Sequence, residues 1–139
     1  MHGPDKRPVK AWPFSSVPID NLMTNAINHS GPLAGYKIIE IAGIGPSPLC
    51  CSLLADMGAN VIRIDRKGPT GLGFEYAGPK ADIRRRGRPS VAVDLKNPQG
   101  VDTVLRLAAS ADALVDPMRP GVMEKLGLGP DICLSLIHI

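Results

Sequence analysis

Aromatic residues make up only 4% of the 139-residue sequence, and no apolar run approaches the roughly 20 residues of a membrane-spanning helix. The scarcity of aromatic rings excludes a protein that stacks bases along single-stranded nucleic acid. The short apolar runs exclude an integral membrane protein, and the beginning of the sequence lacks the basic-then-apolar pattern of a secretory signal. Three cysteines, two of them adjacent at Cys50 and Cys51, cannot form a disulfide framework or a spaced zinc site. We therefore expect a cytoplasmic protein, with mitochondria or peroxisomes as the alternatives in a eukaryote.

The sequence also lacks the residue groupings of common catalytic and metal sites. Its three histidines stand at positions 2, 29 and 138, and no Ser-His-Asp, paired-carboxylate or metal-ligand spacing is present. Glu40 and Asp56 are candidate general bases with no visible partner. Cys50 and Cys51 begin an expected helix, where core packing is the expected role, although a helix amino terminus lowers the pKa of a thiol such as Cys50. We expect no bound metal and no tightly bound cofactor.

Positive charge is concentrated in one stretch of the chain. Residues 66–88 contain seven basic and two acidic side chains, a net charge of +5, whereas the whole sequence carries +3. A localised cationic segment in an otherwise mildly acidic chain favours a site for an anionic ligand over a surface that coats nucleic acid. A solvated run of charges is the alternative.

The hydrophobic patterns predict an α/β fold. Residues 1–30 contain four prolines and no periodicity, which predicts a disordered leader. Short β-branched runs predict strands at residues 36–41, 60–64, 90–95 and 113–115. Apolar residues at helical spacing predict helices at residues 48–57, 98–110 and 122–126. In the first helix the shared apolar face consists of Leu49, Leu53, Leu54 and Met57, and Asn97 is placed to cap the second.

The alternation of strands and helices predicts a partial Rossmann-like, doubly wound parallel sheet over residues 31–132. Residues 133–139 are interpreted as an atypical tail, for which we consider a foreign origin or a truncated record.

Basic residues follow three of the four predicted strands, at Arg66, Lys96 and Arg119. Ligands of open parallel sheets bind at the carboxyl ends of the strands, and guanidinium groups suit phosphates because they donate paired hydrogen bonds. These cations, with the basic cluster at residues 84–88, predict a site for a polyanionic ligand. The turn at residues 43–45 and Asp65, about 20 residues further on, offer an alternative, a nicotinamide dinucleotide, but Pro48 occupies the third glycine position.

Several motifs occur together and in order along residues 31–132: GPLAG at 31–35, EIAGIGPSP at 40–48, LADMGA at 54–59, VIRIDR at 61–66, DLK at 94–96 and RPGVMEKLGLGP at 119–130. This set resembles the class III CoA-transferase (CaiB/BaiF) family, and most of all its racemase branch. The likeness covers the amino-terminal part of such an enzyme, so the resemblance implies the amino-terminal part of the class III CoA-transferase fold.

The resemblance implies an acyl-CoA thioester as the ligand, with coenzyme A bound as part of the substrate. By motif position the residues implied to contact CoA are Arg66, Val93, Asp94, Leu95, Lys96, Pro117, Met118, Arg119 and Lys125. Lys125 stands where many relatives have arginine. Arginine can donate two parallel hydrogen bonds to a phosphate, whereas lysine offers a single localised charge. The basic cluster at residues 84–88 is assigned to CoA binding only by its place before the third strand.

In the racemase branch the enzyme epimerises the α-carbon of 2-methylacyl-CoA thioesters by proton transfer. The alternatives are a transferase that moves CoA between carboxylic acids, and a non-catalytic module that binds CoA or a nucleotide. The catalytic residues of both enzymes are expected downstream of residue 139, so we expect no turnover by this chain alone. Full-length members form interlocked homodimers, an arrangement that this chain is not expected to reproduce, and neither nucleic acid nor a membrane is an expected partner.

Overall fold

The computed structural model describes residues 30–68 and 85–136. The predicted leader at residues 1–30, except Ser30, lies outside the described residues, and so does most of the cationic stretch. Chain order in the described parts is β1 (Lys37–Ile41), α2 (Pro46–Asp56), β2 (Asn60–Arg66), β3 (Ser90–Val93), α3 (Pro98–Ala108), β4 (Ala113–Val115), α4 (Val122–Lys125) and α5 (Pro130–Ser135).

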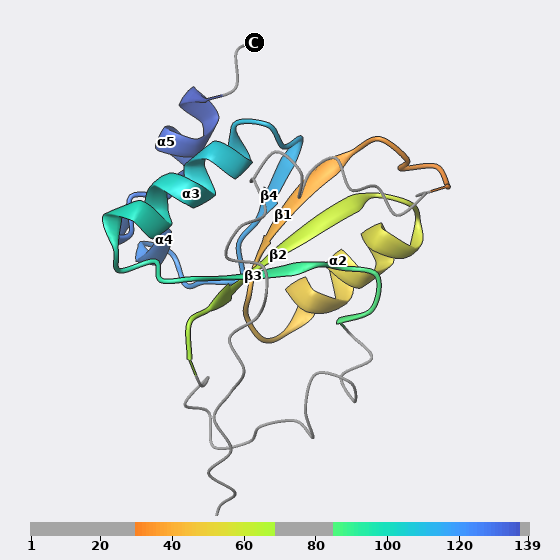
Figure 1. Ribbon diagram of the computed structural model, residues 1–139, viewed down its shortest axis with the longest axis horizontal. Helices are drawn as coiled ribbons and strands as arrows, with labels where there is room; N and C mark the ends of the chain where they lie inside the picture. The colour runs from red at the N-terminus through yellow and green to blue at the C-terminus, as the bar shows by residue number, and fades with distance from the viewer. Residues whose placement is uncertain (1–29, 69–84, 137–139) are drawn as a thin grey trace, which may run out of the picture.

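The four strands form one parallel sheet in the order β3-β2-β1-β4 (Figure 1). On the central strand β1, Ile39 pairs with Ile62 of β2 on one side and with Leu114 of β4 on the other. The chain thus moves outward from β1 to β3 and then crosses back to the far side of β1. This reversal is the defining feature of a doubly wound sheet, and the predicted α/β fold class is confirmed.

Two apolar clusters cover opposite faces of the sheet, because successive strand residues point to opposite sides. On one face Ile39, Ile62 and Ile64 pack with Val104 and Leu107 of α3. On the other face the cluster beneath α2 consists of Ile38, Cys51, Ala59 and Val61. Figure 1 shows α2 and α3 on opposite sides of the strands.

The beginning of α3 follows the local chemistry of its sequence. Oδ1 of Asn97 accepts a hydrogen bond from the backbone N–H of Gln99 at 2.9 Å, and Pro98 occupies the first turn, as predicted. Gly100 lies against the end of β3, where a Cβ atom would come within 2.1 Å of the Asp94 carbonyl oxygen. The glycine therefore lets α3 start directly behind the strand that precedes it.

The apolar face predicted for α2 lies mostly on the outer side of the helix, because three of its four residues are exposed. Leu49, Leu53 and Met57 are 40–55% exposed, whereas Leu54 packs against the cluster beneath the helix. The side chains that α2 turns inward, Pro48, Cys51 and Ser52, are small, so the helix approaches the sheet closely. Cys51 is buried as expected, but its neighbour Cys50 is exposed.

Element boundaries differ from the predictions by a few residues. Helix α2 starts at Pro46, because proline fits a first helical turn, and β3 stops at Val93, where the chain turns toward α3. Helix α5 was not predicted, and it includes residues 133–135 of the predicted tail. In the part of the chain that the structure describes, no helix has the length and apolarity to cross a membrane.

Candidate functional site

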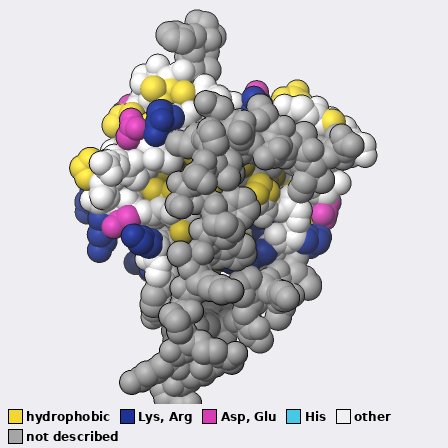
Figure 2. Space-filling model, in the orientation of Figure 1, with side chains coloured by type: hydrophobic (Ala, Val, Ile, Leu, Met, Phe, Trp, Pro, Cys, Tyr) yellow, Lys and Arg dark blue, Asp and Glu magenta, His cyan; other side chains and the backbone are white. Residues whose placement is uncertain are grey.

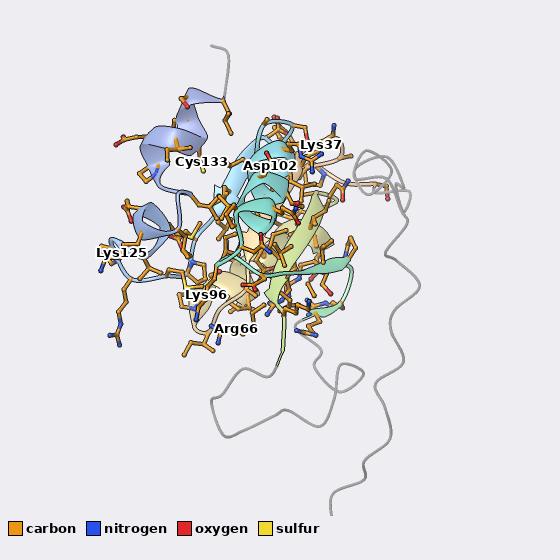
Figure 3. All side chains as sticks on the ribbon, turned by 60° about the vertical axis from the view of Figure 1, so that its left-hand side comes forward. Lys37, Arg66, Lys96, Asp102, Lys125 and Cys133 are labelled. Carbon is orange, nitrogen blue, oxygen red and sulfur yellow. The ribbon has the colours of Figure 1, made fainter. Side chains whose placement is uncertain are left out.

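The carboxyl ends of β2 and β3 lie side by side, and they place Arg66 next to the segment that follows β3. Arg66, the last residue of β2, is the register partner of Val93, the last residue of β3. Val93 is buried in the core on the α3 side, while Arg66 is exposed. Figure 3 shows Arg66 and Lys96 at the same edge of the molecule, with Lys37 at the opposite end.

A tight turn after β3 brings Lys96 to the surface. Oδ1 of Asp94 accepts a hydrogen bond from the backbone N–H of Lys96 at 3.0 Å, so the Asp94 carboxylate holds the turn. Leu95 between them packs against the α3-side core, whereas Asp94 and Lys96 are exposed. Of the four consecutive residues implied as contacts, the side chains of Asp94 and Lys96 are therefore the most accessible to a ligand.

A groove of about 530 Å³ joins this turn to α3 and to the end of α4. Its lining residues are Leu95, Lys96, Pro98, Val101, Asp102, Leu105, Lys125, Leu126 and Gly127. Lys96 and Lys125, which are far apart in the sequence, supply its two cations, and the Asp102 carboxylate pairs with Arg106 at 3.0 Å. In Figure 2, Lys and Arg side chains gather on the left-hand side of the molecule, the side of α3 and α4 in Figure 1. An apolar floor with cations beside it suits a ligand that combines an apolar or aromatic part with anionic groups.

The remaining implied contacts, Pro117, Met118 and Arg119, follow β4. Oδ1 of Asp116 accepts a hydrogen bond from the backbone N–H of Met118 at 2.7 Å, and Arg119 is exposed. Strands β3 and β4 form opposite edges of the sheet, roughly 14 Å apart at three strand spacings. Arg119 does not line the groove that contains Lys96 and Lys125. The structure therefore brings Leu95, Lys96 and Lys125 together, with Arg66 at the neighbouring strand end, and leaves Arg119 outside their groove.

The first turn and the segment after β4 meet at Gly43. A Cβ atom at this position would lie 2.4 Å from Cγ of Pro117 and 2.6 Å from its Cβ. Gly43 is therefore required by the close approach of Pro117, which fixes the spacing between the ends of β1 and β4. This packing role accounts for one of the glycines that suggested a dinucleotide turn.

Three arginines of the predicted basic cluster form ion pairs within the protein. Arg85 pairs with Asp65 at 3.0 Å, Arg86 pairs with Asp56, and Arg88 pairs with Glu40. These pairs attach the segment before β3 to β1, to β2 and to α2, while residue 84 lies outside the described residues. Their carboxylate partners neutralise much of the charge that the sequence offered to a ligand, so the described part of the cluster has a structural role.

Glu40 is completely buried between the sheet and α2. Its Oε1 accepts a hydrogen bond from Nη1 of Arg63 at 2.9 Å, and its Oε2 accepts one from Nη1 of Arg88. Burial raises the pKa of the Glu40 carboxyl, and the two guanidinium groups oppose that rise. Because Glu40 has no access to solvent, it is not placed to act as a general base on a bound substrate.

The dinucleotide alternative depends on Asp65, whose carboxylate already has two cationic neighbours. It accepts hydrogen bonds from Nε of Arg63 at 3.2 Å and from Nη2 of Arg85 at 3.0 Å. This network of ion pairs was not predicted from the sequence. Glu40 and Arg63 are nevertheless charged residues within two apolar strands, and they lie on the same face of the sheet. A charged residue at an expected core position of two adjacent strands is the pattern that predicts such a pair.

The thiol of Cys51 is not a nucleophile in this environment. Burial raises its pKa to about 11, so it stays protonated at neutral pH. Cys51 therefore acts as a small apolar side chain beneath α2.

The sequence profile of CoA-transferase family III matches residues 33–137. The alpha-methylacyl-CoA racemase of Mus musculus is 46% identical over 103 residues, which are 74% of this chain and 25% of the mouse protein. The human enzyme of the same name is 42% identical over 102 residues, 72% of this chain and 24% of its own length. The probable fatty acyl-CoA transferase Rv3272 of Mycobacterium tuberculosis is 37% identical over 112 residues, 75% of this chain and 28% of its own length.

Solved structures give the same relationship. A crystal structure of Rv3272 superimposes with a TM-score of 0.68 at 37% identity, covering 78% of this chain and 31% of that one. A CAIB/BAIF family protein from Brucella suis superimposes with a TM-score of 0.65 at 28% identity, covering 76% of this chain and 31% of that one. The chain spans about a quarter of the length of the curated relatives described above.

Proposed function

Because the chain belongs to CoA-transferase family III, we propose that it binds the CoA part of an acyl-CoA thioester at the groove between β3, α3 and α4. The observation that carries this proposal is that Lys96 and Lys125 line one groove with an apolar floor, and that Arg66 ends the strand next to β3. CoA combines an adenine ring with a 3′-phosphate and a diphosphate. The lysines supply point charges for phosphate oxygens, and Arg66 adds a positive charge at the neighbouring strand end.

For the whole protein we propose epimerisation of the α-carbon of 2-methylacyl-CoA thioesters. The identity of 46% and 42% to two alpha-methylacyl-CoA racemases supports this choice over the 37% identity to a probable fatty acyl-CoA transferase. In this reaction a base removes the proton next to the thioester carbonyl and an acid returns one to the opposite face. The residues of this chain hold and orient the CoA part, since the described residues contain no histidine and their Glu40 is closed to solvent.

A transferase that moves CoA between carboxylic acids is the second candidate. The structural similarity to Rv3272 and the 33% identity to the beta subunit of the succinyl-CoA–L-malate CoA-transferase of Chloroflexus aurantiacus favour it. Both candidates require the same CoA contacts, so the binding proposal is common to them.

Calorimetric titration with CoA, 3′-dephospho-CoA and NAD tests the binding proposal. We expect CoA to bind most tightly, dephospho-CoA to bind more weakly because it lacks a phosphate, and NAD to bind weakest. A preference for NAD over CoA would contradict the proposal.

Turnover is tested separately, by incubating the 139-residue chain with a 2-methylacyl-CoA in D₂O. We expect no loss of the α-proton above the rate without protein, since the acid and base lie outside this chain in our proposal. Measurable exchange by the purified chain would show that it holds the catalytic groups itself.

A further inference from the structure

The turn that carries Lys96 to the groove is closed by two hydrogen bonds, and Asp94 accepts both of them. The backbone carbonyl oxygen of Asp94 accepts a hydrogen bond from the N–H of Asn97 at 3.1 Å, which makes residues 94–97 a β-turn. Oδ1 of Asp94 accepts a hydrogen bond from the N–H of Lys96 at 3.0 Å, the side-chain contact by which aspartate stabilises such turns. Lys96 is therefore the third residue of a turn whose first residue supplies both acceptors.

The residues around Lys96 in this turn are anchored to α3. Leu95 packs against the core on the α3 side, and the side chain of Asn97 caps the helix. Gly100 lies so close behind the turn that a Cβ atom there would come within 2.1 Å of the Asp94 carbonyl oxygen. The hydrogen bond from the Lys96 N–H to the Asp94 carboxylate fixes the peptide that lies between these anchors.

Lys125, the second cation of the groove, is held independently of this turn. Met123 and Leu128, on either side of it in the sequence, are 3% and 2% exposed in the core, and the N–H of Leu128 donates to the Met123 carbonyl oxygen at 2.9 Å. The separation of the two lysines therefore depends on where the turn at residues 94–97 places Lys96. A separation that is fixed before the ligand arrives lowers the ordering cost of binding.

We propose that Asp94 is a positioning residue for Lys96. Its carboxylate fixes the turn, and Lys96 rather than Asp94 meets the anionic ligand; this role rests on the proposed binding of CoA at the groove. The resemblance implied a direct contact between Asp94 and CoA, whereas Oδ1 of Asp94 is already engaged by the Lys96 N–H. Asp94 is exposed, so its negative charge repels phosphate groups nearby while its hydrogen bond supports their binding. These two effects have opposite signs and are separable by substitution.

Asp94→Asn and Asp94→Ala form a matched pair, because both remove the charge but only asparagine keeps an oxygen that accepts the Lys96 N–H. We expect Asp94→Asn to bind CoA as tightly as the wild type or more tightly, since a repulsive charge is gone. Asp94→Ala should bind roughly two- to tenfold more weakly than Asp94→Asn, the range for one hydrogen bond. Calorimetric titration at one ionic strength measures the three affinities, and equal affinities of the two variants would overturn the proposal.

The same pair of substitutions in a Lys96→Ala background tests whether Asp94 acts through Lys96. We expect the two Asp94 variants to bind CoA equally in this background, since the side chain that the turn positions is absent. A direct contact between Asp94 and the ligand would instead weaken binding by Asp94→Asn and preserve the difference in the Lys96→Ala background. Either of these results would overturn the proposal.

Amide hydrogen exchange at Lys96, followed by NMR without CoA, tests the turn itself. We expect the Lys96 N–H to exchange faster in Asp94→Ala than in the wild type, and Asp94→Asn to retain the wild-type rate. An unchanged rate in Asp94→Ala would show that the carboxylate does not hold the turn, and the proposal would be wrong.

Asp112 supplies the control for a general loss of stability. It is also exposed, and its Oδ2 accepts the backbone N–H of Lys37 at 2.8 Å, at the opposite end of the molecule from Lys96 (Figure 3). Asp112→Ala and Asp112→Asn should bind CoA equally, and a difference as large as that at Asp94 would contradict a specific role. No binding of CoA by the wild type would overturn the proposed function, whereas wild-type binding with equal Asp94 variants would overturn only the positioning of Lys96.

Discussion

Glu40 and Arg63 are register partners on β1 and β2, and Nη1 of the largely buried Arg63 donates to Oε1 of the fully buried Glu40 at 2.9 Å. The other oxygen of Glu40 accepts from Arg88, whose side chain is also fully buried. In Glu40→Ala both guanidinium groups lose their shared anion, so we expect the free energy of unfolding to fall by about 3 kcal/mol or more. Urea unfolding of the two proteins measures the difference.

The matched control removes the ion pair of Arg86 and Asp56, whose side chains are half exposed. Because water screens this pair, Asp56→Ala should change the unfolding free energy by less than about 1 kcal/mol. Equal losses in the two variants would mean that the buried network contributes no more than a surface pair.

The raised pKa of Glu40 predicts a specific pH dependence of stability. Between its usual value of 4.5 and its higher value in the folded state, the folded protein holds a proton that the unfolded chain releases. This contribution is complete below pH 4.5 and is lost as the pH rises through the folded pKa. The stability of the wild type relative to Glu40→Gln should therefore fall as the pH is raised above 4.5 in urea titrations. A relative stability that increases with pH would show a lowered pKa instead.

The close approach of Pro117 to Gly43 makes a substitution at Gly43 costly. A methyl group there would lie 2.4 Å from Cγ of Pro117, so Gly43→Ala should destabilise the fold by about 1–3 kcal/mol through overpacking. Pro117→Gly removes the atoms that the methyl group would meet. In a double-mutant cycle measured by thermal unfolding, the double variant should therefore be more stable than the sum of the single losses predicts. Strict additivity would indicate that the two residues do not constrain each other.

The three cysteines should differ in their reactivity toward an alkylating reagent. Cys50 is exposed, Cys51 is buried with a pKa of about 11, and burial raises the pKa of the partly buried Cys133. Iodoacetamide at mildly alkaline pH should therefore label Cys50 first and leave Cys51 unlabelled, whereas all three should react in urea. Peptide mass spectrometry identifies the labelled positions, and rapid labelling of Cys51 in the folded protein would contradict its burial.

The sequence predicted the sheet well, because the β-branched runs and the glycine and proline boundaries around them are local features. Local sequence did not determine which side of α2 packs against the sheet. The leucine stripe of α2 has the spacing of a core face, yet the sheet below it holds the Glu40–Arg63 pair and accepts the smaller Cys51 and Ser52. Helical periodicity identifies an apolar side of a helix but not the surface against which that side packs.

The candidate site was predicted in part for a similar reason. Strand ends gave Arg66 and Lys96, and the family motif gave Lys125, which the fold of α4 brings to the groove that Lys96 lines. A count of charges overestimated the positive charge that residues 84–88 offer to a ligand. Arg85, Arg86 and Arg88 form ion pairs with carboxylates from β1, β2 and α2. Which cations remain for a ligand depends on tertiary pairing that a count of charges does not contain.

The most direct test is a calorimetric titration of CoA into the wild-type chain, Lys96→Ala/Lys125→Ala and Lys37→Ala. Lys37 lies at the opposite end of the molecule from Lys96 (Figure 3), so its removal controls for the loss of a positive charge. Each lost charge-assisted contact should weaken binding by about 1.5–3 kcal/mol, so the double variant should bind at least about a hundredfold more weakly while Lys37→Ala binds like the wild type. Equal affinity of all three proteins, or no binding by the wild type, would contradict the assignment of this groove to CoA.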